Sequence, residues 1–200
     1  MNALLPVTRL LLIANIGGYV LQWLTGQRVM LWLALWPPNS GQYAPDFQPW
    51  QLVSYAFLHG GFTHLLFNMF GLYMFGSEIE RLLGGKRFLL YYFACIVGAA
   101  LTQLAVAALG DGDIHPTVGA SGGVFGLLLA YGLAFPHRRL MLLFPPIPMP
   151  AWLFVTLYGL FELVLGVTRT ADGVAHFAHL GGMAAGFALI LYWRGKSRLV

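Results

Sequence analysis

Cysteine and charge are both scarce in this chain of 200 residues. The one cysteine, Cys95, lies inside an apolar run, so we expect a small buried side chain, with no internal disulfide and no cysteine cluster for a metal. Only 9% of the residues are charged, whereas soluble proteins have roughly 25%. Hydrophobic residues make up 58% of the chain. This composition excludes an ordinary soluble domain and indicates a polytopic membrane protein.

Long apolar runs account for most of the sequence. A window of about 20 residues finds six candidate membrane spans, at 8–24, 62–83, 87–109, 119–135, 150–167 and 175–193. No internal repeat or low-complexity tract divides the chain, so a single membrane domain over residues 1–200 suffices. The predicted fold class is therefore an all-α polytopic membrane protein, a bundle of six transmembrane helices.

The 11 basic residues lie in short clusters between the apolar runs, which favours topology signals over nucleic-acid binding. Arg28 and Arg169 fall on one side of the membrane. The others fall on the side of the two termini: Arg9, Arg81, Lys86, Arg87, Arg138, Arg139, Arg194, Lys196 and Arg198. This bias predicts that both termini are cytoplasmic and that the second, fourth and sixth spans run inward from the outer face.

His64, Ser121 and His179 each lie near the start of one of these inward-running spans. They should therefore share a depth in the outer half of the bilayer, where polar side chains are costly and suggest function. A serine hydroxyl is a weak nucleophile that must give its proton to a base, and an imidazole within hydrogen-bond distance can take it near neutral pH. Ser121 and His179 are the candidate nucleophile and base.

Small residues accompany both candidates. Gly182 and Gly186 lie on the same helix face as His179, and Gly122 and Gly126 form a matching pair next to Ser121. Such pairs let membrane helices approach closely, which a short bond between serine and histidine requires. Taken alone, each pair indicates only helix packing.

A second polar pair could stabilise the negative charge of a tetrahedral intermediate. His64 and Asn68 are four residues apart and share a helix face. Together with the backbone N–H of Ser121, they are candidate oxyanion donors. The alternative is a hydrogen-bond link between helices.

The first gap, at residues 25–61, is rich in aromatic residues and is broken by prolines. Trp32, Trp36, Phe47 and Trp50 suit a segment in the membrane interface. A loop that only packs on the bundle is the alternative.

The chain resembles the rhomboid family of intramembrane serine proteases over all six spans. The resemblance rests on Gly119-Ala120-Ser121-Gly122, on His64-xxx-Asn68, and on Ala178-His179 followed by Gly182-xxx-Gly186. It implies a dyad of Ser121 and His179 without a third carboxylate, an oxyanion site of His64, Asn68 and the Ser121 amide, and transmembrane substrates cut near their outer end. The first gap resembles the family's membrane-embedded first loop. Glu80 and Arg81 fit its Glu-Arg-xx-Gly pattern, with a structural role.

Two positions depart from the family pattern. Trp50-Gln51 stands where the family often has Trp-Arg, so the arginine's contribution to loop order is absent or replaced. Phe125 stands where some members have a tyrosine that packs on the base. An aromatic ring remains there, so stacking on His179 is still expected.

Other polar residues have simpler interpretations. Glu162 lies inside an apolar run, where we expect a structural hydrogen bond; a part in opening a substrate gate is an alternative, and a third catalytic member is less favoured. His176, with His179 and His64, could suggest a metal. The His-Glu-xx-His spacing is missing and carboxylates are scarce, so neither a metal nor another cofactor is expected. His59 is expected to pack in the first loop.

The sequence thus predicts an intramembrane serine endopeptidase that acts on transmembrane proteins within the lipid bilayer, with no nucleic-acid partner. A catalytically silent rhomboid-like protein that binds membrane clients is the alternative, although such proteins usually lack the serine or the histidine. A small transporter would explain six spans but not a serine, an imidazole and donors at one level. The compact chain favours a bacterial inner membrane.

Overall fold

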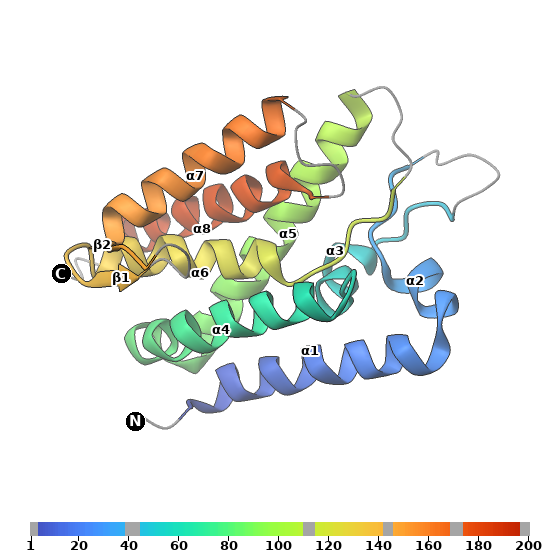
Figure 1. Ribbon diagram of the computed structural model, residues 1–200, viewed down its shortest axis with the longest axis horizontal. Coiled ribbons are helices and arrows are strands. Elements are labelled where there is room, and N and C mark those ends of the chain that lie inside the picture. The colour runs from blue at the N-terminus through green and yellow to red at the C-terminus, as the bar shows by residue number, and fades with distance from the viewer. Residues whose placement is uncertain (1–3, 39–44, 110–114, 142–145, 169–173, 197–200) are drawn as a thin grey trace.

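The computed structural model describes residues 4–38, 45–109, 115–141, 146–168 and 174–196, so Arg169 and Arg198 of the charge count lie outside it. Helices dominate the described residues (Figure 1). Their bounds are α1 Pro6–Thr25, α2 Gln27–Leu33, α3 Gln51–Ser54, α4 Phe62–Leu83, α5 Gly85–Leu109, α6 Ser121–Ala134, α7 Ala151–Thr168 and α8 His176–Lys196.

Helix α6 is the centre of the bundle. It is apolar all round and most of its side chains are buried, as expected for a helix surrounded by others. It contacts α4, α5, α7 and α8, while α1 packs on α4. Figure 1 shows that α4, α6 and α8 all begin at one end of the bundle, and that α1 begins and α8 ends at the other. The starts of three helices therefore lie at a common level.

Each predicted span corresponds to one described helix, with ends that differ by at most three residues. By length and composition, three of the described helices, α1, α5 and α7, are able to cross a membrane, and α6 is a shorter apolar helix. Six membrane crossings and a single domain remain predictions.

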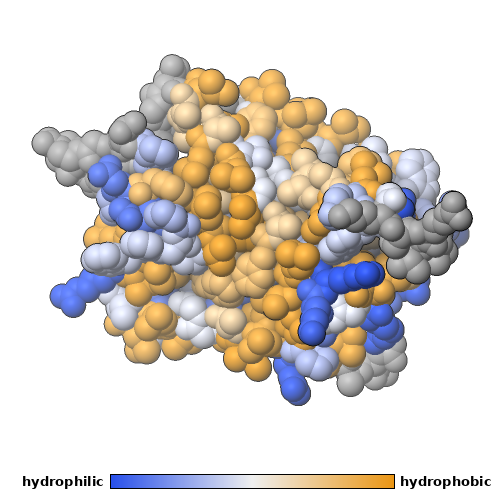
Figure 2. Space-filling view, turned by 180° about the vertical axis from the view of Figure 1, so that it is seen from behind, coloured by the Kyte–Doolittle hydropathy of each residue, from blue (hydrophilic) through white to orange (hydrophobic). Residues whose placement is uncertain are grey.

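The outer surface of the bundle is apolar. Leu10 and Ile13 on α1, and Leu160, Phe161 and Val164 on α7, are exposed. Figure 2 shows hydrophobic side chains across the middle of one face, with hydrophilic ones mostly toward its ends. Soluble monomers rarely expose such large apolar patches, whereas lipid tails match them.

The first loop is ordered by Gln51, which is almost fully buried. Its Oε1 accepts bonds from the backbone N–H groups of Trp36 and Gln48, both at 3.2 Å, and its Nε2 donates to the Trp32 carbonyl at 3.4 Å. One glutamine amide thus links separate parts of the loop at the position where the family often has arginine. The predicted place of this loop in the membrane interface stays a prediction.

Among the described residues, the connection from α6 to α7 departs from the all-α prediction. Strands β1 (Arg139–Met141) and β2 (Pro148–Pro150) pair in antiparallel fashion, with Leu140 opposite Met149. Strands of three residues are too short to show an alternating pattern, which is why sequence periodicity does not reveal them.

The carboxylate of Glu80 holds the start of α1 against the end of α4. It accepts bonds from the backbone N–H groups of Val7 at 3.0 Å and Thr8 at 2.7 Å, and from the Thr8 hydroxyl at 2.7 Å. These amides belong to the first turn of α1, where N–H groups have no partner within the helix and the dipole favours negative charge. Glu80 therefore has a structural contact, at the end of the bundle opposite the starts of α6 and α8.

Replacing Glu80 by alanine is expected to destabilise the protein by about 2–4 kcal/mol, because it leaves buried donors of α1 without an acceptor. Thermal unfolding in detergent micelles measures the effect. Glu78→Ala is the matched control: Glu78 pairs with Arg81 and Arg138 at the surface, and its loss should cost less than about 1 kcal/mol. Equal losses for the two variants would contradict the role assigned to Glu80.

Candidate active site

Ser121 is the first residue of α6, and the segment before it is held by backbone contacts with the first loop. Leu35 and Thr117 exchange two backbone hydrogen bonds, at 3.0 and 2.9 Å, and Gly119 N–H donates to the Tyr55 carbonyl at 3.0 Å. Gly119 has a φ of 122°, a conformation that side chains disfavour. The sharp turn at this glycine lets α6 begin at Ser121, with the free N–H groups of its first turn beside the hydroxyl.

His179 lies in the first turn of α8 and contacts Ser121 directly. The distance from His179 Nε2 to Ser121 Oγ is 2.8 Å, a hydrogen bond between two helices. Gly122 and Gly182 explain how the helices come so close. A β-carbon at Gly182 would lie 2.8 Å from the carbonyl carbon of Gly122 and 3.0 Å from its Cα, so only glycine fits.

Gly122 and the second glycine of each pair also face α5, and a β-carbon at Gly122 would run into Ala99. A β-carbon at Gly126 would run into Cys95, and one at Gly186 would meet Tyr91 and Cys95. Cys95 is a buried free thiol. The glycine pairs therefore bring three helices together, whereas the sequence analysis assigned them to α6 and α8 only.

Phe125 lies flat on the imidazole of His179. The ring centroids are 4.2 Å apart and the planes differ by 7°. Tyr158 of α7 stacks on Phe125, with centroids 5.4 Å apart. These contacts restrict rotation of the His179 ring, so its Nε2 stays directed at Ser121.

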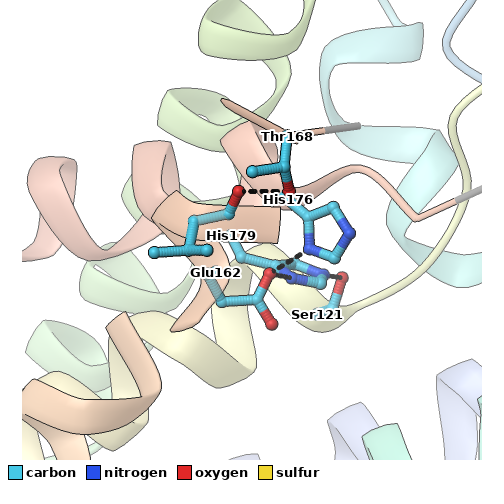
Figure 3. A network of polar contacts seen from close by, with 6 residues as sticks. Ser121, Glu162, Thr168, His176 and His179 are labelled. Atoms are coloured by element: carbon cyan, nitrogen blue, oxygen red, sulfur yellow. Dashed lines mark hydrogen bonds and ion pairs between the residues drawn. The ribbon is translucent and has the colours of Figure 1, made fainter. Parts of the chain in front are cut away.

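Glu162 of α7 contacts the other nitrogen of the same ring. Its Oε2 lies 2.8 Å from His179 Nδ1 and 2.7 Å from His176 Nδ1, and all three side chains are buried. Figure 3 shows the His179 ring between the Glu162 carboxylate and Ser121, with the His176 ring above it. An ionised carboxylate only accepts hydrogen bonds, so with Glu162 ionised each Nδ1 would carry a proton, and His179 Nε2 would be left to accept the proton of Ser121.

The sequence analysis did not predict this contact. It favoured a structural hydrogen bond for Glu162 and considered His176 only as a metal ligand. The available signals were a single carboxylate inside an apolar run and two histidines three residues apart. Neither shows that α7 turns its carboxylate toward the base on α8.

The same residues form a group that could hold a metal ion, since their ligand atoms lie within 4.8 Å of one another. Both imidazoles, however, already bond to one carboxylate oxygen at ordinary hydrogen-bond distances. His64 is not part of this group. Hydrogen bonds thus account for both Nδ1 contacts without an ion, and the expectation that the protein needs no metal stays a prediction.

His64 and Asn68 lie next to the loop that leads to Ser121. A β-carbon at Gly119 would lie 2.7 Å from His64 Nε2 and 3.8 Å from Asn68 Nδ2. The Gly60 N–H donates to His64 Nδ1 at 3.3 Å, which leaves the proton of a neutral ring on Nε2, the nitrogen that faces Gly119. Asn68 uses one N–H on the His64 carbonyl at 2.9 Å and keeps a second.

The remaining histidines have no described contact with Ser121 or His179. His59 is fully buried, with its ring edge-on to that of His64 at 5.3 Å between centroids. His115 and His137 are exposed in the connections that flank α6. His59 is thus a packing residue beside His64, as the sequence analysis expected.

Comparison with known proteins gives related results along nearly the whole chain. A family model described as "Rhomboid domain" matches residues 46–196. The "Rhomboid protease GlpG" of Yersinia pestis (strain Pestoides F) is 30% identical over 98% of this chain, and that of Yersinia pseudotuberculosis serotype I (strain IP32953) is 31% identical over the same share. The chain spans 66% of the length of these relatives. "Rhomboid protein 1, mitochondrial" of Saccharomyces cerevisiae is 31% identical over 68% of this chain and 39% of its own.

Proposed function

The chain belongs to the rhomboid family, and we propose that it is an intramembrane serine endopeptidase that hydrolyses peptide bonds of transmembrane proteins near the outer face of the bilayer. The observation that carries the proposal is the 2.8 Å contact between Ser121 Oγ and His179 Nε2. The relatives whose names include "protease" support it.

Ser121 attacks the carbonyl carbon of the scissile bond while His179 Nε2 takes the hydroxyl proton. When the tetrahedral intermediate collapses, His179 gives this proton to the leaving amine, and the substrate's carbonyl carbon stays bound to Ser121 as an ester. Water then attacks the ester while His179 takes its proton. The bond to Ser121 Oγ breaks, His179 returns the proton to that oxygen, and the carboxylic acid product leaves. His179 can perform each transfer from one place, because Phe125 and the contact with Ser121 hold its ring.

The negative charge that forms on the substrate oxygen needs donors that are in place beforehand. We assign this role to His64 Nε2–H, to the free N–H of Asn68, and to the backbone N–H of Ser121. The first two adjoin Gly119, and the third lies at the start of α6, where it has no backbone partner among the described residues. Their position next to Gly119, two residues before the serine, supports the assignment over a link between helices.

The protein is an integral membrane protein, as its family and its apolar helices indicate. We assign both termini to the cytoplasm, the site to the outer half of a bacterial inner membrane, and the single domain to six spans with the first loop in the interface. Substrates are proteins that cross the same bilayer. Neither a cofactor nor a nucleic acid is required for the proposed chemistry.

The proposal is tested by reaction with a fluorophosphonate probe and by cleavage of a reporter with one transmembrane helix, both in detergent micelles. Wild-type protein should be labelled and should cleave the reporter, whereas Ser121→Ala should do neither, because the attacking oxygen is gone. Ser77→Ala, which removes a hydroxyl on α4 that accepts a bond from the Leu5 backbone, should keep both activities.

Folded wild-type protein that shows neither activity would overturn the proposal. It would favour the alternative, a rhomboid-like protein that binds membrane clients without cutting them. Labelling that persists in Ser121→Ala would show that another residue reacts.

A further inference from the structure

We propose that Glu162 is a positioning residue for His179, so that the base is oriented by a carboxylate from α7, and this inference rests on the proposed function. The resemblance to the rhomboid family implies only a dyad. Glu162 would therefore add a third side chain to the site, drawn from α7.

Two hydrogen bonds join the serine, the imidazole and the carboxylate in sequence, one at each nitrogen of the His179 ring. Ser121 Oγ is 2.8 Å from His179 Nε2, and Glu162 Oε2 is 2.8 Å from His179 Nδ1 (Figure 3). The bond at Nδ1 selects the tautomer in which Nε2 has its lone pair free. Without a partner at Nδ1, the ring could carry its proton on Nε2, where it could not accept one from the serine.

The carboxylate would also stabilise the positive charge that His179 acquires during the reaction. His179 becomes positive when it takes the Ser121 proton, and a negative group in contact with the ring stabilises that state more strongly in a buried site than in water. A buried carboxylate is costly unless it is hydrogen-bonded. Glu162 meets this requirement with two imidazole N–H groups on Oε2, one of which belongs to the base itself.

His176 distinguishes positioning from a simple link between helices. It binds the same oxygen at 2.7 Å and lies one helical turn before His179. A link from α7 to α8 would be complete with His176 alone. The second bond reaches the ring that contacts Ser121, and this contact gives Glu162 a part in proton transfer.

The test compares three purified variants with wild type in micelles: Glu162→Gln, His176→Gln and Ser121→Ala. We expect Glu162→Gln to lower kcat by on the order of 10²–10⁴-fold with KM little changed, because an amide carries no charge and can hold the wrong tautomer. His176→Gln should lower kcat only a few-fold, because Glu162 keeps its bond to His179. The thermal unfolding temperatures of Glu162→Gln and His176→Gln should be close to that of wild type.

Glu162→Gln that keeps at least a third of the wild-type kcat would overturn the inference while leaving the proposed function intact. Equal losses in Glu162→Gln and His176→Gln, accompanied by equal loss of thermal stability, would show a structural link instead. Wild-type protein without Ser121-dependent cleavage would overturn the proposed function itself. These three outcomes are distinct.

A measurement on wild-type protein does not depend on how the variants fold. In nitrogen NMR spectra of protein labelled at histidine, the ring assigned to His179 by comparison with His179→Ala should carry its proton on Nδ1. The same ring protonated on Nε2 alone would overturn the inference.

Discussion

Replacing His179 by alanine is expected to lower kcat for the membrane reporter by about 10⁵–10⁶-fold, as much as Ser121→Ala does. The two side chains share one proton through a 2.8 Å contact. Removing either ends the transfer, since the hydroxyl alone is a weak nucleophile and the imidazole alone has nothing to activate. The double variant should therefore be no slower than either single variant.

The matched control is His137→Ala, which removes an exposed histidine after α6 and should leave kcat near the wild-type value. Initial rates over a range of reporter concentrations separate kcat from KM. A double variant much slower than both single variants would show that Ser121 and His179 act independently, contrary to the mechanism.

Replacing Gly182 by alanine is expected to reduce both activity and stability. The added carbon would lie within 3.0 Å of the Gly122 carbonyl carbon and Cα, which are backbone atoms that cannot rotate away. Helices α6 and α8 must then separate by roughly 1 Å, a displacement of catalytic groups that can cost on the order of 10²-fold in rate. We expect a loss of stability of about 1–3 kcal/mol as well.

Gly17→Ala is the matched control, because no other part of the described structure lies within 4 Å of a β-carbon at this position of α1. Rate and thermal unfolding in micelles should both stay close to wild type. A Gly182→Ala protein with normal rate and normal unfolding would show that the two helices do not require glycine at their contact.

Sequence alone predicts the helices and the pair of Ser121 and His179 because the signals are local. Apolar runs mark the helices, and the inward direction of alternate spans puts distant residues at one level. The glycine next to Ser121 and the one three residues after His179 indicate a close approach. The Phe125 ring also follows from its position one turn after the serine.

The rest depends on how helices rotate about their axes when they pack, which local patterns do not determine. Glu162 contacts His179 only because α7 presents that position to α8. Gly126 and Gly186 turn toward α5 for the same reason. Gln51 orders the first loop through backbone groups of residues far apart in the chain, and no periodic signal marks such contacts.

Helix α7 contributes few buried side chains, namely Ala151, Val155 and Glu162. Its remaining surface is partly or wholly open to the surroundings of the bundle, and its 18 residues span about 27 Å, close to the thickness of the hydrocarbon layer. Helices of this kind change their tilt when the bilayer becomes thicker or thinner. Because Glu162 contacts the His179 ring, the mechanism proposed above predicts that a change in the tilt of α7, and hence in bilayer thickness, would alter the rate of proton transfer from Ser121.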